Sequence, residues 1–393
     1  MKRILCGLLI AILGVSFLIG CIVAPEQAVA TEAAQTPEAT QAPSATAAPT
    51  EKPSATAAVE SSTEQDFSAF STITTTGVLD FPLEFTLLPD AYNTYDTEHK
   101  GTNFVIHYTT DVYGDGVTYD KFCRIYLPYG YDQNDKDTKY NVIYFQHGNN
   151  GSPNEFFDHV LKSANVIRLF DNMFDPDHKV MEPCIIVCPT YYLKYDESAY
   201  ITPGDNPAGD GRYQGIPANY DLEVVQDLIP AVESQLNVYC DDFSEAGIMA
   251  TRSHRAWAGY SRGSVCTFYM FHNDFEYFEY WMPMSATCMQ EGVTLGAETD
   301  WTHADAYQYL KETIEAHPDL PFFLFAASGG ESDAPAMRVQ MKYFIDQTET
   351  FSFGLDPNTN NIYYTCSEFF HNDLYFPFYL YNARNVLFSM DSQ

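Results

Sequence analysis

The sequence predicts an α/β fold whose central sheet is mostly parallel and is flanked by helices. Short, nearly continuous apolar runs, such as residues 140–146 (YNVIYFQ) and 184–188 (CIIVC), are typical of strands that are buried on both faces. Segments with a helical spacing of apolar residues separate these runs along the chain. Because strands that alternate with helices pair in parallel, the pattern favours a parallel sheet over a sandwich or barrel.

The predicted elements begin with a hairpin and end with a helix. Residues 104–109 and 121–127 are β-rich runs that are joined through Gly114-Asp115-Gly116, which indicates a hairpin. Further strands are expected at 140–146, 184–188, 255–258, 280–284, 322–327 and 362–366, and helices at 155–174, 222–236, 265–278 and 372–388. Residues 66–100 contain strand-like and turn-like pieces that the pattern does not place.

The composition excludes several classes of partner. The chain has 393 residues, of which 53 are acidic and 20 are basic, so its formal charge is −33. Phosphate binding needs clustered Lys and Arg, so nucleic acid is excluded and an anionic membrane surface is disfavoured. The 46% of hydrophobic residues excludes a largely disordered chain and leaves enough apolar surface for a large core.

Residues 1–21 have the pattern of a secretory signal peptide. Lys2 and Arg3 precede an apolar stretch at 4–19, which ends in Leu18-Ile19-Gly20-Cys21. This ending resembles a bacterial lipobox, and the resemblance implies that Cys21 is lipidated and becomes the mature N-terminus. An uncleaved membrane anchor is the alternative, because the stretch is nearly long enough to span a bilayer. Both interpretations place the body of the protein outside the cytoplasm and tether it to a membrane.

A change in composition marks residues 22–65 as a linker. This segment consists almost entirely of Ala, Thr, Pro, Glu, Ser and Gln and lacks aromatic residues, so it buries too little apolar surface to offset its ordering entropy. We expect a flexible spacer, followed by one domain at 66–393. The seven cysteines of this domain are an odd number without a C-x-x-C pair or zinc spacing, so at least one free thiol and no metal site are expected.

The pentapeptide Gly259-Tyr260-Ser261-Arg262-Gly263 matches the G-x-S-x-G pattern of a serine nucleophile. It follows a short apolar strand and precedes a helical stretch, which is the setting that this pattern requires. Side chains at 259 and 263 would clash in so tight a turn, and Ser261 is forced into an exposed, strained conformation. The helix N-terminus and the Arg262 amide would then face a developing oxyanion. A chance match within a loop is the alternative.

A serine hydroxyl needs a base, and in this setting the partners follow in the order Ser, acid, His. Three histidines follow Ser261 at loop-like positions: His303, His317 and His371. His317 lies at the wrong end of the strand at 322–327, and His303 lies in an acidic helix start. His371 lies just beyond the last strand, where the active sites of parallel sheets form, so it is the predicted base. A surface or core-edge histidine is the alternative.

The acid is expected after the preceding strand, within residues 328–333 (SGGESD). Asp333 is the predicted acid because a short carboxylate in a Gly-rich turn is readily fixed against an imidazole, and Glu331 is the alternative. Its role would be to hold the histidine tautomer and stabilise the imidazolium. The second oxyanion donor is expected in the loop at 147–151 (HGNNG), where we predict the amide of Asn149; an ordinary Gly-rich turn is the alternative.

Further segments complete a pattern that resembles carbohydrate esterase family one, the feruloyl and acetylxylan esterases, over residues 120–390. Esterase D and the mycobacterial mycolyltransferases are similar in fold. The segments that carry the resemblance are Arg124-Ile-Tyr-Leu-Pro128, Ile143-Tyr-Phe-Gln-His-Gly148, Ala164-Asn-Val-Ile167, Asp227-Leu-Ile-Pro230, His254-Arg-Ala-Trp-Ala-Gly-Tyr-Ser-Arg-Gly263 and Met284-Ser-Ala286.

The resemblance implies the α/β-hydrolase fold and a Ser–His–Asp hydrolase without cofactor. Ser261, Asp333 and His371 fall at the positions of the family's triad. Arg262 and Ser264 stand where the family often has Met and Gly, so the pocket wall is expected to differ. The acid turn fits the family's Gly-x-x-Asp, but the spacing after it is shorter, which keeps Glu331 open as the acid.

The sequence therefore predicts a lipid-anchored serine esterase at a bacterial cell surface, acting on feruloyl or acetyl esters of plant cell-wall polysaccharide such as xylan. An acyltransferase of the same fold and a catalytically inactive binding lipoprotein are the alternatives. The Tyr-, Gly- and Asp-rich segment at 191–220 is a long loop, and loops of this length are usually functional. We expect it to overhang the site and contribute tyrosines to an aryl or sugar pocket, with a solvated insertion as the alternative.

Overall fold

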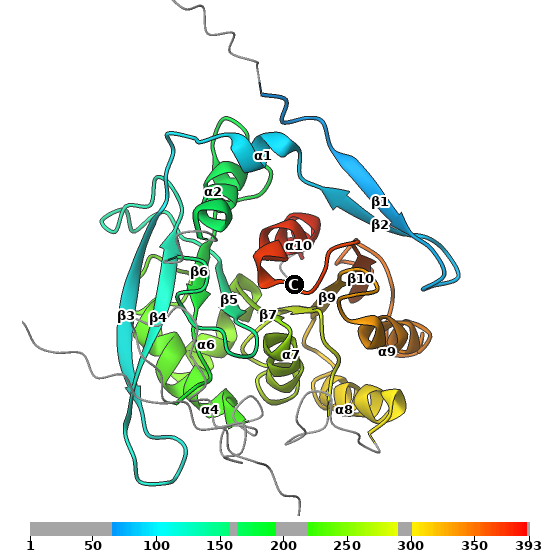
Figure 1. The fold of residues 1–393 in the computed structure, drawn as a ribbon. Helices are drawn as coiled ribbons and strands as arrows, with labels where there is room; N and C mark the ends of the chain where they lie inside the picture. Colours follow the sequence, from blue (N-terminus) through cyan, green and yellow to red (C-terminus); the bar gives the residue numbers. More distant parts are fainter. Residues whose placement is uncertain (1–64, 158–162, 194–218, 290–300, 391–393) are drawn as a thin grey trace, which may run out of the picture. The chain divides into compact units, whose positions relative to one another are not determined.

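The computed structural model describes residues 65–157, 163–193, 219–289 and 301–390 (Figure 1). The predicted signal peptide with Cys21, nearly all of the predicted linker and residues 194–218 of the long loop lie outside the described residues. None of the described helices is long and apolar enough to cross a membrane. The seven cysteines of the described residues are all buried and free.

Eight strands of the described residues form one mixed sheet in the spatial order β10-β9-β8-β7-β5-β6-β4-β3. Pairing is parallel from β6 to β10, whereas the β3–β4 and β4–β6 pairs are antiparallel. The strands are β3 (Thr102–Thr110), β4 (Tyr119–Leu127), β5 (Val142–Gln146), β6 (Ile185–Cys188), β7 (Arg255–Tyr260), β8 (Tyr280–Met284), β9 (Phe323–Ser328) and β10 (Ile362–Cys366). The mostly parallel sheet and the β3–β4 hairpin are thereby confirmed.

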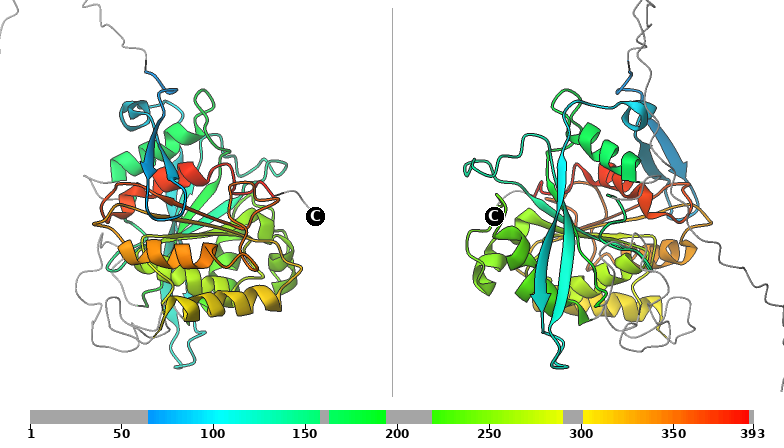
Figure 2. Two further views of the ribbon diagram at one scale, coloured as in Figure 1. Left: turned by 90° about the vertical axis from the view of Figure 1, so that its right-hand side faces the viewer. Right: turned by 60° about the vertical axis from the view of Figure 1, so that its left-hand side comes forward.

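Helices cover both faces of this sheet, and each face has its own apolar core (Figures 1 and 2). One face carries α2 (Ser163–Phe174), α10 (Phe376–Ala383) and the outlying hairpin of β1 (Ser71–Thr75) and β2 (Leu83–Leu87). The other face carries α4 (Asp221–Glu223), α5 (Ile229–Glu233), α6 (Glu245–Ala250), α7 (Arg262–Asn273), α8 (His303–Ala316) and α9 (Pro335–Ile345). Strand β7 contributes side chains to both cores: Trp257 packs into one, and its neighbours Ala256 and Ala258 pack into the other.

Two of the predicted helices differ in detail from the helices of the structure. The helix expected at 222–236 contains a π-helical turn, Val224–Leu228, between α4 and α5, and Pro230 lies in the first turn of α5. Proline has no N–H to donate to the preceding turn, so the backbone widens there instead of continuing as a regular α-helix. The closing helix expected at 372–388 begins as a 3₁₀ turn, Asp373–Tyr375, and continues as α10.

The strand that carries the candidate nucleophile begins at a buried ion pair. Arg255, the first residue of β7, donates to both carboxylate oxygens of Glu233 in α5 at 2.7 Å, and each side chain is at most 2% exposed. The Arg255 guanidinium also donates to the Ile248 carbonyl, and the Tyr144 hydroxyl of β5 donates to Glu233 at 2.9 Å. This network holds α5, α6, β5 and β7 together at one end of the sheet.

We predict that Glu233→Gln lowers the free energy of unfolding by about 3–5 kcal/mol, because the variant leaves the buried Arg255 without its counter-charge. The matched control is Glu315→Gln, which removes a 3.6 Å pair with Lys311 in which the glutamate is 64% exposed. The control should cost less than about 1 kcal/mol. Urea unfolding followed by circular dichroism measures both values, and equal losses would contradict a structural role for the buried pair.

Candidate active site

Ser261 occupies a strained turn between β7 and α7. Its backbone has φ 56° and ψ −118°, a conformation that a non-glycine residue adopts only when its surroundings enforce it. A Cβ atom at Gly259 would lie 2.1 Å from the carbonyl oxygen of Gly263, and one at Gly263 would lie 2.1 Å from the carbonyl oxygen of Gln146. Both glycines are therefore required, although the constraint on Gly263 comes from the end of β5 rather than from the side chain at 259.

The structure brings Ser261, His371 and Asp333 into one hydrogen-bonded chain. The Ser261 hydroxyl lies 2.8 Å from Nε2 of His371, and Nδ1 of His371 lies 2.6 Å from Oδ1 of Asp333. The three residues follow the carboxyl ends of β7, β10 and β9, which is where the sequence argument expected them. An imidazole in this position can accept the serine proton through Nε2 while Nδ1–H donates to the carboxylate.

Asp333 is buried and surrounded by hydrogen-bond donors. Its Oδ2 accepts from the Ser285 hydroxyl at 2.6 Å and from the Gly329 amide, and its Oδ1 also accepts from the Tyr260 hydroxyl at 3.1 Å. Burial acts to raise the pKa of Asp333, but the hydrogen bonds from His371, Ser285 and Gly329 outweigh it and hold the pKa below its usual value. The carboxylate is therefore ionised at neutral pH, as a partner of an imidazolium must be.

The alternative acid and the other two candidate bases are not part of this hydrogen-bonded chain. Glu331 is 85% exposed and pairs with Arg338 at 2.6 Å. His303 is the first residue of α8, and His317 follows the end of that helix and lies 3.7 Å from Glu276. Within the described residues, Asp333 is the carboxylate that is hydrogen-bonded to His371.

The loop that follows β5 borders the nucleophile. A Cβ atom at Gly148 would lie 3.3 Å from Cβ of Ser261, which is a tight contact, so glycine at position 148 favours this close approach of the loop. Gly148, Asn149, Ser261 and His371 line one small pocket of about 220 Å³. Arg262 is the first residue of α7, and amides at a helix N-terminus point toward bound negative charge. Both predicted oxyanion donors thus lie in segments that border Ser261.

Two tyrosines after β6 hold this loop in place. The Tyr191 hydroxyl donates to the Gly148 carbonyl at 3.0 Å. The Tyr192 hydroxyl lies 3.2 Å from Oδ1 of Asn149 and accepts from the Asn150 amide at 3.0 Å. Both rings are buried, so these two tyrosines support the loop from behind and, in the described part of the chain, are not among the residues that line the pocket at Ser261. The remaining tyrosines of the predicted substrate loop, within 194–218, lie outside the described residues.

His147 anchors the same loop from the core side. One ring nitrogen lies 2.8 Å from the Gly148 carbonyl and the other 2.8 Å from the Thr190 hydroxyl. Burial lowers the pKa of His147 to about 4, although the Gly148 hydrogen bond opposes this and nearby Lys121 adds to it. The imidazole is therefore neutral at physiological pH and acts as a fixed structural link.

A buried lysine ties these supports to the sheet. Lys121 of β4 donates to the carbonyls of Thr190 and Tyr192 at 2.8 and 3.0 Å, and pairs with Glu223 at 3.0 Å. Glu223 in turn accepts from the Tyr108 hydroxyl at 2.6 Å. The sequence argument assigned no role to Lys121, Glu223 or Tyr108. A signal did exist for Ser285, which directly follows the strand Tyr280–Met284 at the edge where the other site residues were sought.

The sequence profile of the Esterase family matches residues 120–363, which is more than half of the chain. The chain is 30% identical over 251 residues to endo-1,4-beta-xylanase Y of Acetivibrio thermocellus. This match covers 61% of the chain but only 20% of that relative, so the chain spans about a fifth of its length.

Solved structures of esterases resemble the fold. The feruloyl esterase module from Clostridium thermocellum, as a mutant complexed with sinapinate, aligns with a TM-score of 0.59 and 24% identity, over 78% of this chain and 94% of the module. A CE1 ferulic acid esterase from the anaerobic fungus Anaeromyces mucronatus aligns with a TM-score of 0.51 and 18% identity, over 76% of this chain and 96% of that one. These likenesses concern the fold, and they confirm the predicted α/β-hydrolase type.

We predict that Asp333→Asn lowers kcat for ester hydrolysis by about 10³- to 10⁴-fold with little change in KM, because an amide cannot hold the required histidine tautomer. Glu331→Gln is the control, since that side chain is exposed and paired with Arg338. It should change kcat by less than about threefold. Steady-state kinetics on p-nitrophenyl acetate measure both effects, and a larger loss for Glu331→Gln would reverse the assignment of the acid.

We predict that His147 makes the fold sensitive to acid. Below pH 6.5 the imidazole of the unfolded chain takes up a proton, whereas the folded chain, with a pKa of about 4, does not. Stability is therefore unaffected above pH 6.5 and falls as the pH drops toward 4, by about 2 kcal/mol at pH 5. In urea unfolding at pH 7 and pH 5, His147→Gln should lose about that much less than the wild type, and equal losses would count against this role.

Proposed function

The chain belongs to the Esterase family. We propose that it is a serine esterase of the feruloyl esterase type and that Ser261, His371 and Asp333 are its catalytic triad. The observation that supports the triad is the pair of hydrogen bonds at 2.8 and 2.6 Å that joins the serine hydroxyl through the imidazole to a buried carboxylate. We further propose that the substrates are acyl esters of plant cell-wall polysaccharide such as xylan.

The first half-reaction forms an acyl-enzyme. Nε2 of His371 accepts the hydroxyl proton as Oγ of Ser261 attacks the ester carbonyl carbon, and the carbonyl electron pair moves onto oxygen. The amides of Asn149 and Arg262 donate to this oxyanion, and each such donor contributes roughly 3–4 kcal/mol to lowering the barrier. The tetrahedral intermediate then expels the sugar alkoxide, which takes the proton from His371 as it leaves.

The second half-reaction releases the acid. Water replaces the alcohol, His371 accepts one of its protons, and the resulting hydroxide attacks the acyl carbonyl through a second oxyanion at the same amides. Collapse of this intermediate frees the carboxylic acid and returns the proton to Ser261. Throughout the cycle the Asp333 carboxylate stays ionised and stabilises the imidazolium, consistent with the lowered pKa of that group.

The electrostatics of the pocket favour a neutral ester as substrate. Besides Ser261 and His371, the pocket is lined by Glu155 and Asp373, and the whole chain carries a formal charge of −33. Negative surroundings disfavour anionic ligands, so a neutral ester enters more readily than its free acid. The carboxylate product meets the same repulsion, which favours its release over product inhibition.

The substrate class rests on the relatives. The xylanase that is 30% identical over 251 residues acts, by its name, on a β-1,4-linked xylan chain, and the structurally similar module from Clostridium thermocellum binds sinapinate. A hydroxycinnamoyl ester of xylan joins these two chemistries in one substrate. An acetyl ester is the second member of the proposed class. The described residues that line the pocket lie around Ser261 and His371, and they do not distinguish a feruloyl group from an acetyl group.

The location of the enzyme is a separate part of the proposal. Residues 1–21 are proposed to be a lipoprotein signal peptide, with Cys21 as the lipidated N-terminus, and residues 22–65 to be a tether. The domain at 66–393 would then act outside the cell, near insoluble polysaccharide that cannot enter it. Metabolic labelling with a clickable palmitate analogue tests this part, since Cys21→Ala should abolish the label.

We predict that the wild type hydrolyses methyl ferulate, acetylated xylan or both, and that Ser261→Ala lowers kcat at least about 10³-fold because it removes the nucleophile. Ser389→Ala, at an exposed serine near the C-terminus, is the matched control and should retain full activity. Equal rates for the wild type and Ser261→Ala would contradict the triad. If added xylo-oligosaccharide diverts the acyl group from water to sugar, the enzyme is an acyltransferase instead.

A further inference from the structure

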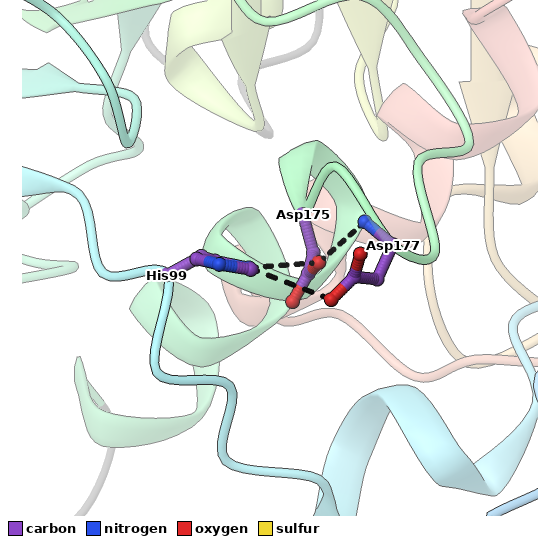
Figure 3. A group of neighbouring side chains, drawn as sticks. All are labelled: His99, Asp175 and Asp177. Carbon is purple, nitrogen blue, oxygen red and sulfur yellow. Dashed lines mark hydrogen bonds and ion pairs between the residues drawn. The ribbon is translucent and has the colours of Figure 1, made fainter.

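His99, Asp175 and Asp177 form a cluster of side chains outside the active site (Figure 3). His99 precedes β3, and the two aspartates follow α2 in the connection to β6. Because β3 and β6 run in the same direction, the segments that precede them meet at the amino end of the sheet. The cluster therefore lies at the opposite end of the sheet from the triad, which follows the carboxyl ends of its strands.

The geometry of the cluster suits one small cation. Nδ1 of His99 lies 3.2 Å from Oδ1 of Asp175 and 4.0 Å from Oδ2 of Asp177, and one ligand atom from each residue lies within 4.8 Å of the others. Figure 3 shows the three side chains pointing toward one another. A tetrahedral ion with bonds of about 2.0–2.1 Å separates its ligand atoms by roughly 3.4 Å. Asp177 is 70% exposed, so its carboxylate is free of packing that would prevent the small closure required.

A second observation points to a ligand. The Asp175 side chain is 1% exposed, and its Oδ1 already accepts from His99 and from the Asp177 amide at 2.8 Å. The Thr97 side chain also hydrogen-bonds to this carboxylate. Oδ2 is equally buried and, within the described residues, has no hydrogen bond of ordinary geometry. A buried carboxylate oxygen without a well-placed donor is costly, and a cation in the cluster would satisfy it.

We propose that His99, Asp175 and Asp177 bind a divalent transition-metal ion of the Zn²⁺ type. An imidazole nitrogen suits zinc, whereas Ca²⁺ and Mg²⁺ take oxygen ligands. The two carboxylates balance the charge of the ion, and water fills the remaining position. The ion joins the segment before β3 to the segment before β6 and thereby stabilises the fold without entering the ester chemistry. The sequence predicts no metal site because 76 residues separate His99 from Asp175, which no short spacing motif spans.

The experiment is a titration of the full chain with ZnCl₂ after treatment with EDTA and dialysis, followed by isothermal calorimetry and thermal unfolding. The variants are His99→Gln and Asp177→Asn, and the matched control is His107→Gln, at an exposed position on β3. The control matters because a chain of charge −33 attracts cations weakly everywhere. Activity on p-nitrophenyl acetate reports that each variant is folded.

The wild type and His107→Gln should each bind one Zn²⁺ and gain about 3 °C or more in Tm at saturation. His99→Gln and Asp177→Asn should bind at least about tenfold more weakly and lose this gain, with kcat/KM unchanged. Zinc binding that is the same in all four proteins, or no binding to the wild type, would overturn the proposal. Calcium binding that survives His99→Gln would equally overturn the assignment to zinc.

Discussion

Gly263 packs its backbone against the carbonyl of Gln146, with no room between them for a side chain. This contact presses the first turn of α7 onto the end of β5, so the loop that follows β5 passes directly beside Ser261. The strained backbone of Ser261 is held by the same approach, since the serine lies between β7 and the helix that Gly263 anchors. One close backbone contact therefore places the nucleophile and the candidate oxyanion loop together, and the rest of the site is built around them.

Tyrosine hydroxyls donate hydrogen bonds to several buried carboxylates of this acidic chain. The chain has 29 tyrosines but only 20 Lys and Arg. Buried carboxylates accept hydrogen bonds from Tyr260 at Asp333, Tyr108 at Glu223, Tyr144 at Glu233 and Tyr126 at Asp171. Glu223 and Glu233 are also paired with the buried cations Lys121 and Arg255. At Asp333 and Asp171 the tyrosine is a neutral donor that satisfies the carboxylate without the cost of burying a second charge. Tyrosine thus serves as a donor to buried carboxylates as well as a core residue, and at Asp333 it contributes directly to the candidate active site.

The sequence predicted those parts of the molecule that a local pattern encodes. Strands Tyr280–Met284 and Ile362–Cys366 have the predicted bounds, because their apolar runs end at turns, whereas α9 and the β1–β2 hairpin have weaker patterns and were not placed. Ser261, Asp333 and His371 could be selected because chain order and strand ends constrain them. Tyr192 and Lys121 could not, because they act through hydrogen bonds to residues 43 and 102 positions away, which no spacing rule connects. Ser285 is an intermediate case, because it directly follows a predicted strand at the edge of the sheet where the site lies.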